Sequence, residues 1–150
     1  MPWLPFAHED VDQTRAWLSR SPRMWTSGRA YTFVIVHRRE AIGTVGFRPS
    51  AAGSAETGYW IDSGHAGQGF VTEAMEALIG FAFNVLGLAR LELITGVDNA
   101  PSVRLAERLG FQLEGRLRSA GLGADGRYDC FLYGLLSSDR SPSDRLPPGR

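Results

Sequence analysis

The segment with the clearest chemical potential is a glycine loop at residues 65–71, between a β-prone stretch and a helical pattern. Gly67 and Gly69 lack a Cβ atom, so the backbone there allows close approach of a bound group. At the start of a helix the N–H groups are unpaired, and the helix dipole adds partial positive charge. The loop therefore suits a phosphate-bearing ligand, although the same glycines would also serve an ordinary strand-to-helix turn.

Two familiar phosphate-binding loops do not fit this segment. A P-loop ends in Gly-Lys-Ser/Thr, whereas Gly69 is followed by Phe70 and the chain contains no lysine. A dinucleotide fingerprint would need a third glycine where the chain has Thr72. Both classes of nucleotide site are therefore excluded.

Other reactive residue types give weaker signals. The single cysteine, Cys130, lies in an apolar run and is interpreted as a small buried hydrophobe. His8, His37 and His65 have no metal-ligand spacing, so no metal site is expected. The expected chemistry therefore centres on the glycine loop.

The composition is that of one globular domain. The chain has 150 residues, 43% of them hydrophobic and 21% charged, and its formal net charge is zero. A neutral surface gives no reason to expect nucleic acid or an anionic membrane as a partner. The start lacks a secretory signal and no apolar run reaches transmembrane length, so a cytoplasmic protein is expected.

The elements that must position the loop follow from hydrophobic periodicity. Helices are expected after Asp10, at residues 72–86 and at residues 101–109, and strands at residues 31–37, 41–47, 56–61, 91–97, 112–119 and 128–136. Hairpins mixed with crossover helices predict an α/β (α+β) fold whose sheet has mixed strand directions. A single domain is expected over residues 1–136, followed by a disordered tail at residues 137–150.

Four segments in this order resemble the GNAT acyltransferase superfamily, and most closely its Rim-type branch, which acetylates the N-termini of ribosomal proteins. They are residues 56–62, 67–74, 97–102 and 109–115. The resemblance implies a mostly antiparallel sheet, flanked by helices on both faces. It also implies that the sheet is splayed between the strands at 56–61 and 91–97, with the pantetheine arm of acetyl-CoA in the gap.

The resemblance also implies a set of contacts with acetyl-CoA as co-substrate. The pyrophosphate would lie on backbone N–H groups of the loop, and backbone N–H groups near Trp60 would contact the oxyanion. Asn99 would either contact the pantetheine amide or shape a turn. The expected cofactor-binding residues are Trp60, Ile61, Gly67, Gln68, Gly69, Phe70, Val71, Asn99 and Ser102. Ala66 and Val71 depart from the usual family motif, which predicts weakened rather than abolished binding.

The catalytic residues expected from the resemblance are Ser102 and Glu56. Ser102 stands where this branch offers a hydroxyl toward the cofactor sulfur, but serine is also a common helix-capping residue. Glu56 is a candidate general base beside the gap, or alternatively a solvated strand carboxylate. Relatives often carry a glutamate where this chain has Gly121.

The predicted function is N-acetyl transfer from acetyl-CoA to a primary amine, either a protein N-terminus or a small amine, by direct attack. The alternative is a non-catalytic acyl-CoA-binding or sensing domain with the same fold. The strand and helix that usually open the family have no counterpart before Met1-Pro2-Trp3. A sheet edge left unpaired in this way would promote pairing, so a homodimer is among the expectations.

Overall fold

The computed structural model describes residues 11–141 of the chain. Its helices are α1 (Val11–Thr26), α2 (Phe70–Gly80) and α3 (Ala100–Arg108). Its strands are β1 (Tyr31–His37), β2 (Glu40–Pro49), β3 (Ser54–Ile61), β4 (Arg90–Gly96), β5 (Gln112–Gly123) and β6 (Gly126–Leu136). The predicted order of these elements is confirmed. The predictions that fall on residues 1–10 lie outside the described part of the chain.

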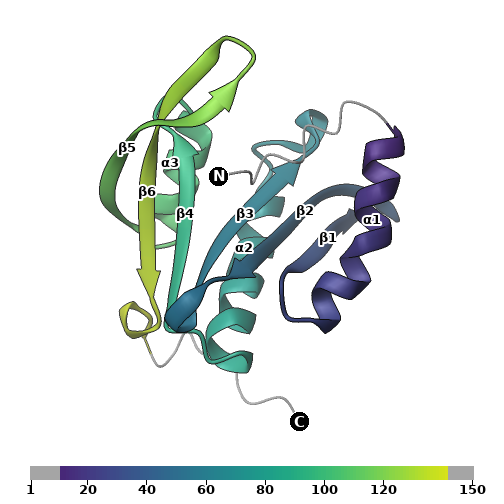
Figure 1. The fold of residues 1–150 in the computed structure, drawn as a ribbon, viewed down its shortest axis with the longest axis horizontal. Coiled ribbons are helices and arrows are strands. Elements are labelled where there is room, and N and C mark those ends of the chain that lie inside the picture. Colours follow the sequence, from purple (N-terminus) through teal and green to yellow (C-terminus); the bar gives the residue numbers. More distant parts are fainter. Residues whose placement is uncertain (1–10, 142–150) are drawn as a thin grey trace.

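The six strands form one sheet in the order β1-β2-β3-β4-β6-β5. Every neighbouring pair is antiparallel except β3 and β4, which run parallel because α2 connects them as a crossover. This parallel ladder holds only four residue pairs, from Ser54↔Arg90 to Thr57↔Leu93. Beyond it β3 stays paired with β2 while β4 stays paired with β6, and Figure 1 shows the two halves diverging. The predicted splay is therefore confirmed.

Helices cover the sheet as predicted. Figure 1 shows α2 and α3 behind the sheet and α1 in front of its β1 edge. Met75 and Ile79 of α2 and Ala106 of α3 are fully buried in one core with Leu91 of β4. Removing this apolar surface from water stabilises the fold, and it fixes both helices against the two halves of the sheet.

The end of α2 differs from the sequence prediction of a single helix. The α-helix ends at Gly80 and continues as a π-helical turn at Phe81–Val85. Phe81, the first residue of this turn, packs against Phe33 with ring centroids 5.6 Å apart and lies 6.5 Å from Trp25. Local periodicity does not distinguish this wider turn from α-helix, because its position depends on aromatic partners from α1 and β1.

Two tight turns close α3 and join the last two strands. Gly110 closes α3 with φ of 86°, and the N–H of Phe111 donates to Ala106 O at 3.0 Å, as in a Schellman ending. In the last hairpin Gly123 pairs with Gly126, so the turn residues are Ala124 and Asp125.

The first residues of the segment predicted to be disordered are part of the fold. Ser137–Asp139 form a 3-10 turn, and the N–H of Ser137 donates to Ala89 O at 2.9 Å. Residues 142–150 lie outside the described part of the chain. Among the described helices, none has the length and apolar character needed to cross a membrane.

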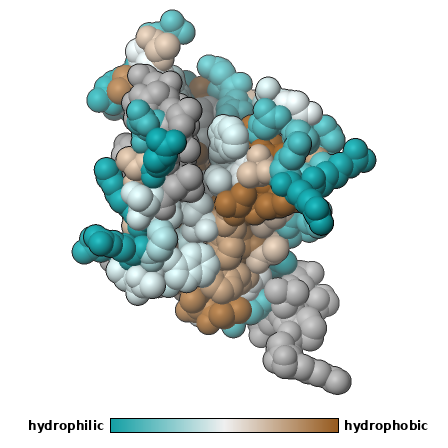
Figure 2. Space-filling view, turned by 90° about the vertical axis from the view of Figure 1, so that its right-hand side faces the viewer, coloured by the Kyte–Doolittle hydropathy of each residue, from teal (hydrophilic) through white to brown (hydrophobic). Residues whose placement is uncertain are grey.

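The β1 side of the molecule carries apolar surface. Val34 and Val36 are 53% and 62% exposed on this strand. A groove of about 240 Å³ runs between β1 and α2, lined by residues that include Phe33, Ile35 and Ala74. Figure 2, which views the molecule from this side, shows the apolar band between polar borders.

Candidate active site

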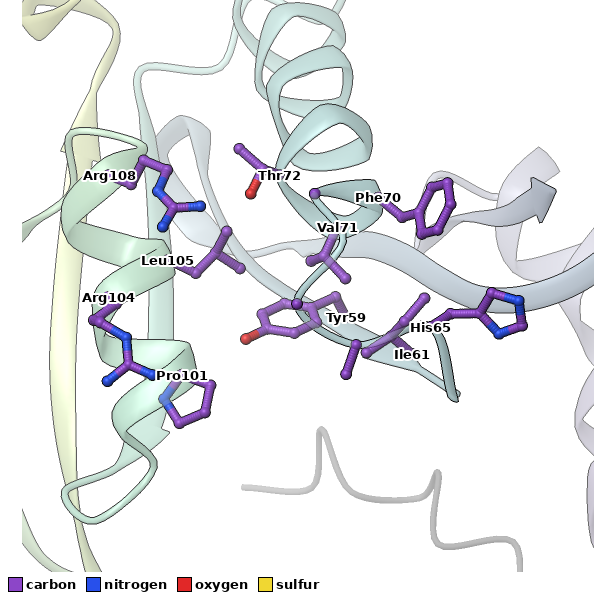
Figure 3. Close-up of a pocket in the computed structure, with 13 residues that line it drawn as sticks. Tyr59, Ile61, His65, Phe70, Val71, Thr72, Pro101, Arg104, Leu105 and Arg108 are labelled. Carbon is purple, nitrogen blue, oxygen red and sulfur yellow. The ribbon is translucent and has the colours of Figure 1, made fainter. Parts of the chain in front are cut away.

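A pocket of about 210 Å³ lies where the glycine loop meets α3 (Figure 3). The loop and the first turn of α2 form one wall, and Ile61 and Tyr59 of β3 form the floor. The opposite wall belongs to α3. The lining residues of that wall are Pro101, Arg104, Leu105 and Arg108. The pocket therefore spans the two halves of the diverging sheet.

The glycine loop owes its path to two left-handed glycines. Gly67 has φ of 74° and Gly69 has φ of 89°, a conformation that is strained for residues with a Cβ. A Cβ built on either glycine would meet no other atom within 4 Å. Gly69 is also the N-cap of α2 and provides no side-chain cap. The first N–H groups of α2 are therefore left for a ligand in the pocket.

Side-chain hydrogen bonds hold the loop in place. His65 Nδ1 and Asp62 Oδ2 lie 2.8 Å apart, and Gln68 Nε2 donates to Gly64 O at 3.0 Å. Gln68 is exposed and does not line the pocket, so its side chain serves the loop itself. The side chain of Gln68 therefore shapes the loop, and only its backbone N–H is left as a contact for the expected cofactor.

Two arginines of α3 make the pocket cationic. Arg104 and Arg108 are four residues apart and share one face of the helix, across from the loop in Figure 3. Together with the start of α2 they form a receptor for an anionic group such as a phosphate. Sequence reasoning missed them, although their spacing and their place just after Ser102 were visible signals.

A hydrogen bond links the two sides of the opening. Tyr59 Oη donates to Ser102 Oγ at 2.9 Å, and the Ser102 N–H donates to Asn99 Oδ1 at 3.3 Å. Burial raises the pKa of Tyr59, so the phenol is protonated near neutral pH. Ser102 is only 5% exposed and is not among the residues that line the pocket, whereas Tyr59 is. Asn99 is the N-cap of α3, a role that was considered for Ser102 on the sequence.

Glu56 and Trp60 lie on the other face of the sheet. Strand alternation turns them away from Thr57 and Tyr59, which face the helices. Glu56 pairs in register with Arg48 of β2 and Glu92 of β4. Burial raises its pKa, Glu92 raises it further, and Arg48 acts in the opposite direction. Glu56 is thus at the base of the opening but outside the pocket.

The outer half of β3 presents unpaired backbone to the opening. The Asp62 N–H donates to Ile42 O of β2 at 2.7 Å. Because N–H groups alternate along a strand, the N–H of Trp60 also points to β2, while those of Tyr59 and Ile61 point to the opening. This geometry narrows the expected oxyanion donors to the N–H groups of Ile61 and Tyr59.

The structure brings together only part of the expected site. Five of the expected cofactor-binding residues line the pocket: Ile61, Gly67, Gly69, Phe70 and Val71. The other expected site residues lie outside it: Glu56, Trp60, Gln68, Asn99 and Ser102. The structure adds Tyr59, Arg104 and Arg108 to the site.

The sequence also matches a known family. Residues 1–112 match the family described as "Acetyltransferase (GNAT) domain". This chain belongs to the GNAT acetyltransferase family. The predicted enzyme class is therefore confirmed, and acetyl-CoA is the co-substrate of GNAT acetyltransferases.

One curated relative supports the Rim-type resemblance, and a second is named only as an N-acetyltransferase. The chain is 35% identical over 136 residues to the ribosomal-protein-serine acetyltransferase of Escherichia coli (strain K12), covering 89% of this chain and 75% of the relative. It is 34% identical over 134 residues to the uncharacterized N-acetyltransferase p20 of Bacillus licheniformis, covering 87% of this chain and 75% of the relative.

Solved structures show the same architecture. RimJ of Mycobacterium smegmatis, in complex with CoA-disulfide, superposes with a TM-score of 0.81 at 25% identity, covering 89% of this chain and 65% of that one. The microcin C7 self-immunity acetyltransferase MccE, in complex with acetyl-CoA and AMP, gives a TM-score of 0.78 at 27% identity. That likeness covers 91% of this chain and 76% of the other. The predicted fold class and the Rim-type likeness of this GNAT protein are confirmed.

Proposed function

We propose that this GNAT protein moves an acetyl group from acetyl-CoA to a primary amine by direct attack, and that the acceptor is a protein N-terminus or a small amine. The observation that carries the proposal is the convergence of three features on one pocket. These are the N-terminus of α2, the arginines of α3 and the open backbone edge of β3.

The residues of the pocket fit the phosphates of acetyl-CoA. The N–H groups from Gly67 to Val71 would hold the pyrophosphate, and Arg104 and Arg108 would pair with phosphate charge. Acetyl-CoA supplies an activated thioester when bound. The chain's own part is to orient it, to stabilise oxyanion charge with the N–H of Ile61 and to provide protons.

Acetyl transfer forms a bond from the amine nitrogen to the acetyl carbon and breaks the bond from that carbon to sulfur. One proton must leave the nitrogen, and one must reach the departing thiolate. Glu56 and Ser102 lie on opposite faces of the opening. This separation supports Glu56, directly or through water, as the base on the acceptor side and Ser102 as a donor on the thiol side.

The likeness to a ribosomal-protein-serine acetyltransferase supports a protein N-terminus as the first acceptor to examine. The alternative, an acyl-CoA-binding domain without turnover, is favoured by one observation. The ring of Tyr128 occupies the space beside Gly121, where relatives often carry a carboxylate. The two functions differ in whether an amine triggers thiol release.

The deciding experiment is a calorimetric titration of the purified chain with acetyl-CoA and, in parallel, with desulfo-CoA. Saturable binding of both ligands is expected, because the main grip is on phosphate. Folded protein that binds neither would refute the proposal.

A second assay separates catalysis from binding. Thiol release is followed with peptides that begin with serine or alanine, with the same peptides blocked at the N-terminus, and with spermidine as a small amine. Release that requires a free amine supports transfer. Tight acetyl-CoA binding without release from any of these amines would favour the binding domain.

A further inference from the structure

We propose that Tyr59 is a positioning residue of this site, which acts through Ser102 by directing the Ser102 hydroxyl proton to the thiol end of the bound donor. This inference rests on the proposed function. No role was predicted for Tyr59, because a tyrosine in an apolar strand is typical of packing.

The hydrogen bond between Tyr59 and Ser102 joins two hydroxyl groups. Tyr59 Oη donates to Ser102 Oγ at 2.9 Å, so one lone pair of the serine oxygen is occupied. The phenol is protonated near neutral pH because burial raises the pKa of Tyr59. Tyr59 is therefore able to donate to Ser102 throughout the pH range in which an acetyltransferase would act.

Two residues hold Ser102 in place, one at its backbone and one at its side chain. Its backbone N–H donates to Asn99 Oδ1 at 3.3 Å, which fixes the residue in the first turn of α3. Tyr59 belongs to β3, on the other side of the opening, and its ring lines the pocket. Asn99 thus fixes the serine backbone, while Tyr59 fixes the rotation of its hydroxyl.

The hydroxyl hydrogen of Ser102 is available to a ligand. When Tyr59 donates, the hydrogen bonds found for Ser102 among the described residues leave its hydroxyl hydrogen without an acceptor, although the residue is only 5% exposed. A buried donor without an acceptor destabilises a protein unless a ligand supplies one. A thiolate sulfur in the opening would be such an acceptor.

The chemistry of transfer gives this hydrogen a use. When the carbon–sulfur bond breaks, the electron pair stays on sulfur, and one proton is required there. Ser102 gives its proton to sulfur and recovers one from the Tyr59 hydroxyl, which in turn is reprotonated from solvent. The released amine proton passes to the base or to water, so protons and charge balance.

The test measures the thiol of bound CoA rather than turnover. The ultraviolet absorbance of the thiolate is followed against pH in complexes of CoA with the unmodified protein, Tyr59→Phe, Ser102→Ala and the double variant. Tyr31→Phe is the matched control, because it removes a half-buried phenol hydroxyl outside the pocket. Thermal unfolding of each variant accompanies the titration.

The proton affinity of the bound thiol should rise about tenfold in Tyr59→Phe, because a hydrogen bond to the thiolate is weakened. The double variant should behave like Ser102→Ala, since Tyr59 acts only through the serine. Tyr31→Phe should match the unmodified protein.

Two results would overturn the inference. One is CoA binding by Tyr59→Phe with an unchanged thiol titration, and the other is a double variant in which the two effects add. Failure of the unmodified protein to bind CoA is a different result, because it would reject the proposed function itself and the role of Tyr59 with it.

Discussion

The ring of Tyr128 lies directly over Gly121, its partner across the β5–β6 ladder. A Cβ built on Gly121 would stand 2.1 Å from Cε2 and 2.3 Å from Cζ of that ring. Gly96 of β4 also touches the ring, with a corresponding distance of 3.2 Å to Cε2. A side chain at position 121 and the present position of Tyr128 therefore exclude each other.

This exclusion predicts an asymmetry between two glycines of β5. Gly121→Ala should lower the free energy of unfolding by about 1–3 kcal/mol, because the methyl group must displace the ring. Gly123→Ala is the control, since its Cβ would meet the ring at an ordinary 3.4 Å. Urea unfolding gives the free energy of unfolding of both variants. The same measurement on Tyr128→Ala and on the double variant Gly121→Ala/Tyr128→Ala gives the coupling energy between positions 121 and 128. Equal losses at the two glycines would contradict this account.

A second prediction concerns the arginines of α3. Arg104→Gln and Arg108→Gln should each weaken CoA binding about tenfold, because a charge-assisted hydrogen bond to phosphate is lost. The loss should shrink as salt concentration rises, since salt screens the interaction. Arg118→Gln, an exposed arginine outside the pocket, is the control. CoA affinity is measured by calorimetry at low and high salt. The prediction is wrong if Arg104→Gln and Arg108→Gln bind CoA as tightly as the unmodified protein.

A third prediction separates backbone strain from ligand contact at the glycine loop. Gly69→Ala and Gly87→Ala should both cost about 1–2 kcal/mol of unfolding free energy, because each residue is left-handed. Neither Cβ would meet a protein atom within 4 Å. Only Gly69 lies at the pocket, so only Gly69→Ala should also weaken CoA binding. Equal CoA affinities of the two folded variants would remove the loop from the binding site.

A fourth prediction follows from the raised pKa of Glu56. The folded protein holds the Glu56 proton more tightly than the unfolded chain, whose glutamate titrates near 4.5. The contribution of the Glu56 proton to the free energy of unfolding is fully present below pH 4.5. It is lost as the pH rises through the higher pKa of Glu56 in the folded protein. The free energy of unfolding of Glu56→Gln, relative to that of the unmodified protein, should therefore be higher at about pH 7.5 than at about pH 4. Urea unfolding at both pH values, with the exposed Glu76→Gln as control, would detect the absence of such a gain.

The fold was largely predictable because its signals are local. The β-forming residues at 31–37 and the helical spacing after Phe70 predicted these elements to within a few residues. Four family-like segments gave the splay, which no local pattern contains. The π-helical turn at Phe81–Val85 was missed because its cause is aromatic packing between distant segments.

The site was harder to predict because its parts meet only in three dimensions. The glycine loop was found from its own composition. Tyr59 was missed because its partner, Ser102, lies on another element and is reached only by folding. Trp60 and Ile61 are neighbours in sequence, yet their N–H groups point to opposite sides of β3, which became clear only from the Asp62 hydrogen bond to β2.

The short ladder between β3 and β4 gives this protein a built-in reporter. Past its four residue pairs, amide hydrogens along β3 alternate between a permanent partner on β2 and open space. In hydrogen–deuterium exchange, Gly58 and Trp60 would stay protected in every state, while Tyr59 and Ile61 would exchange freely until a ligand fills the opening. A ligand in the gap would then be detected as slower amide exchange at the odd-numbered residues of β3 alone.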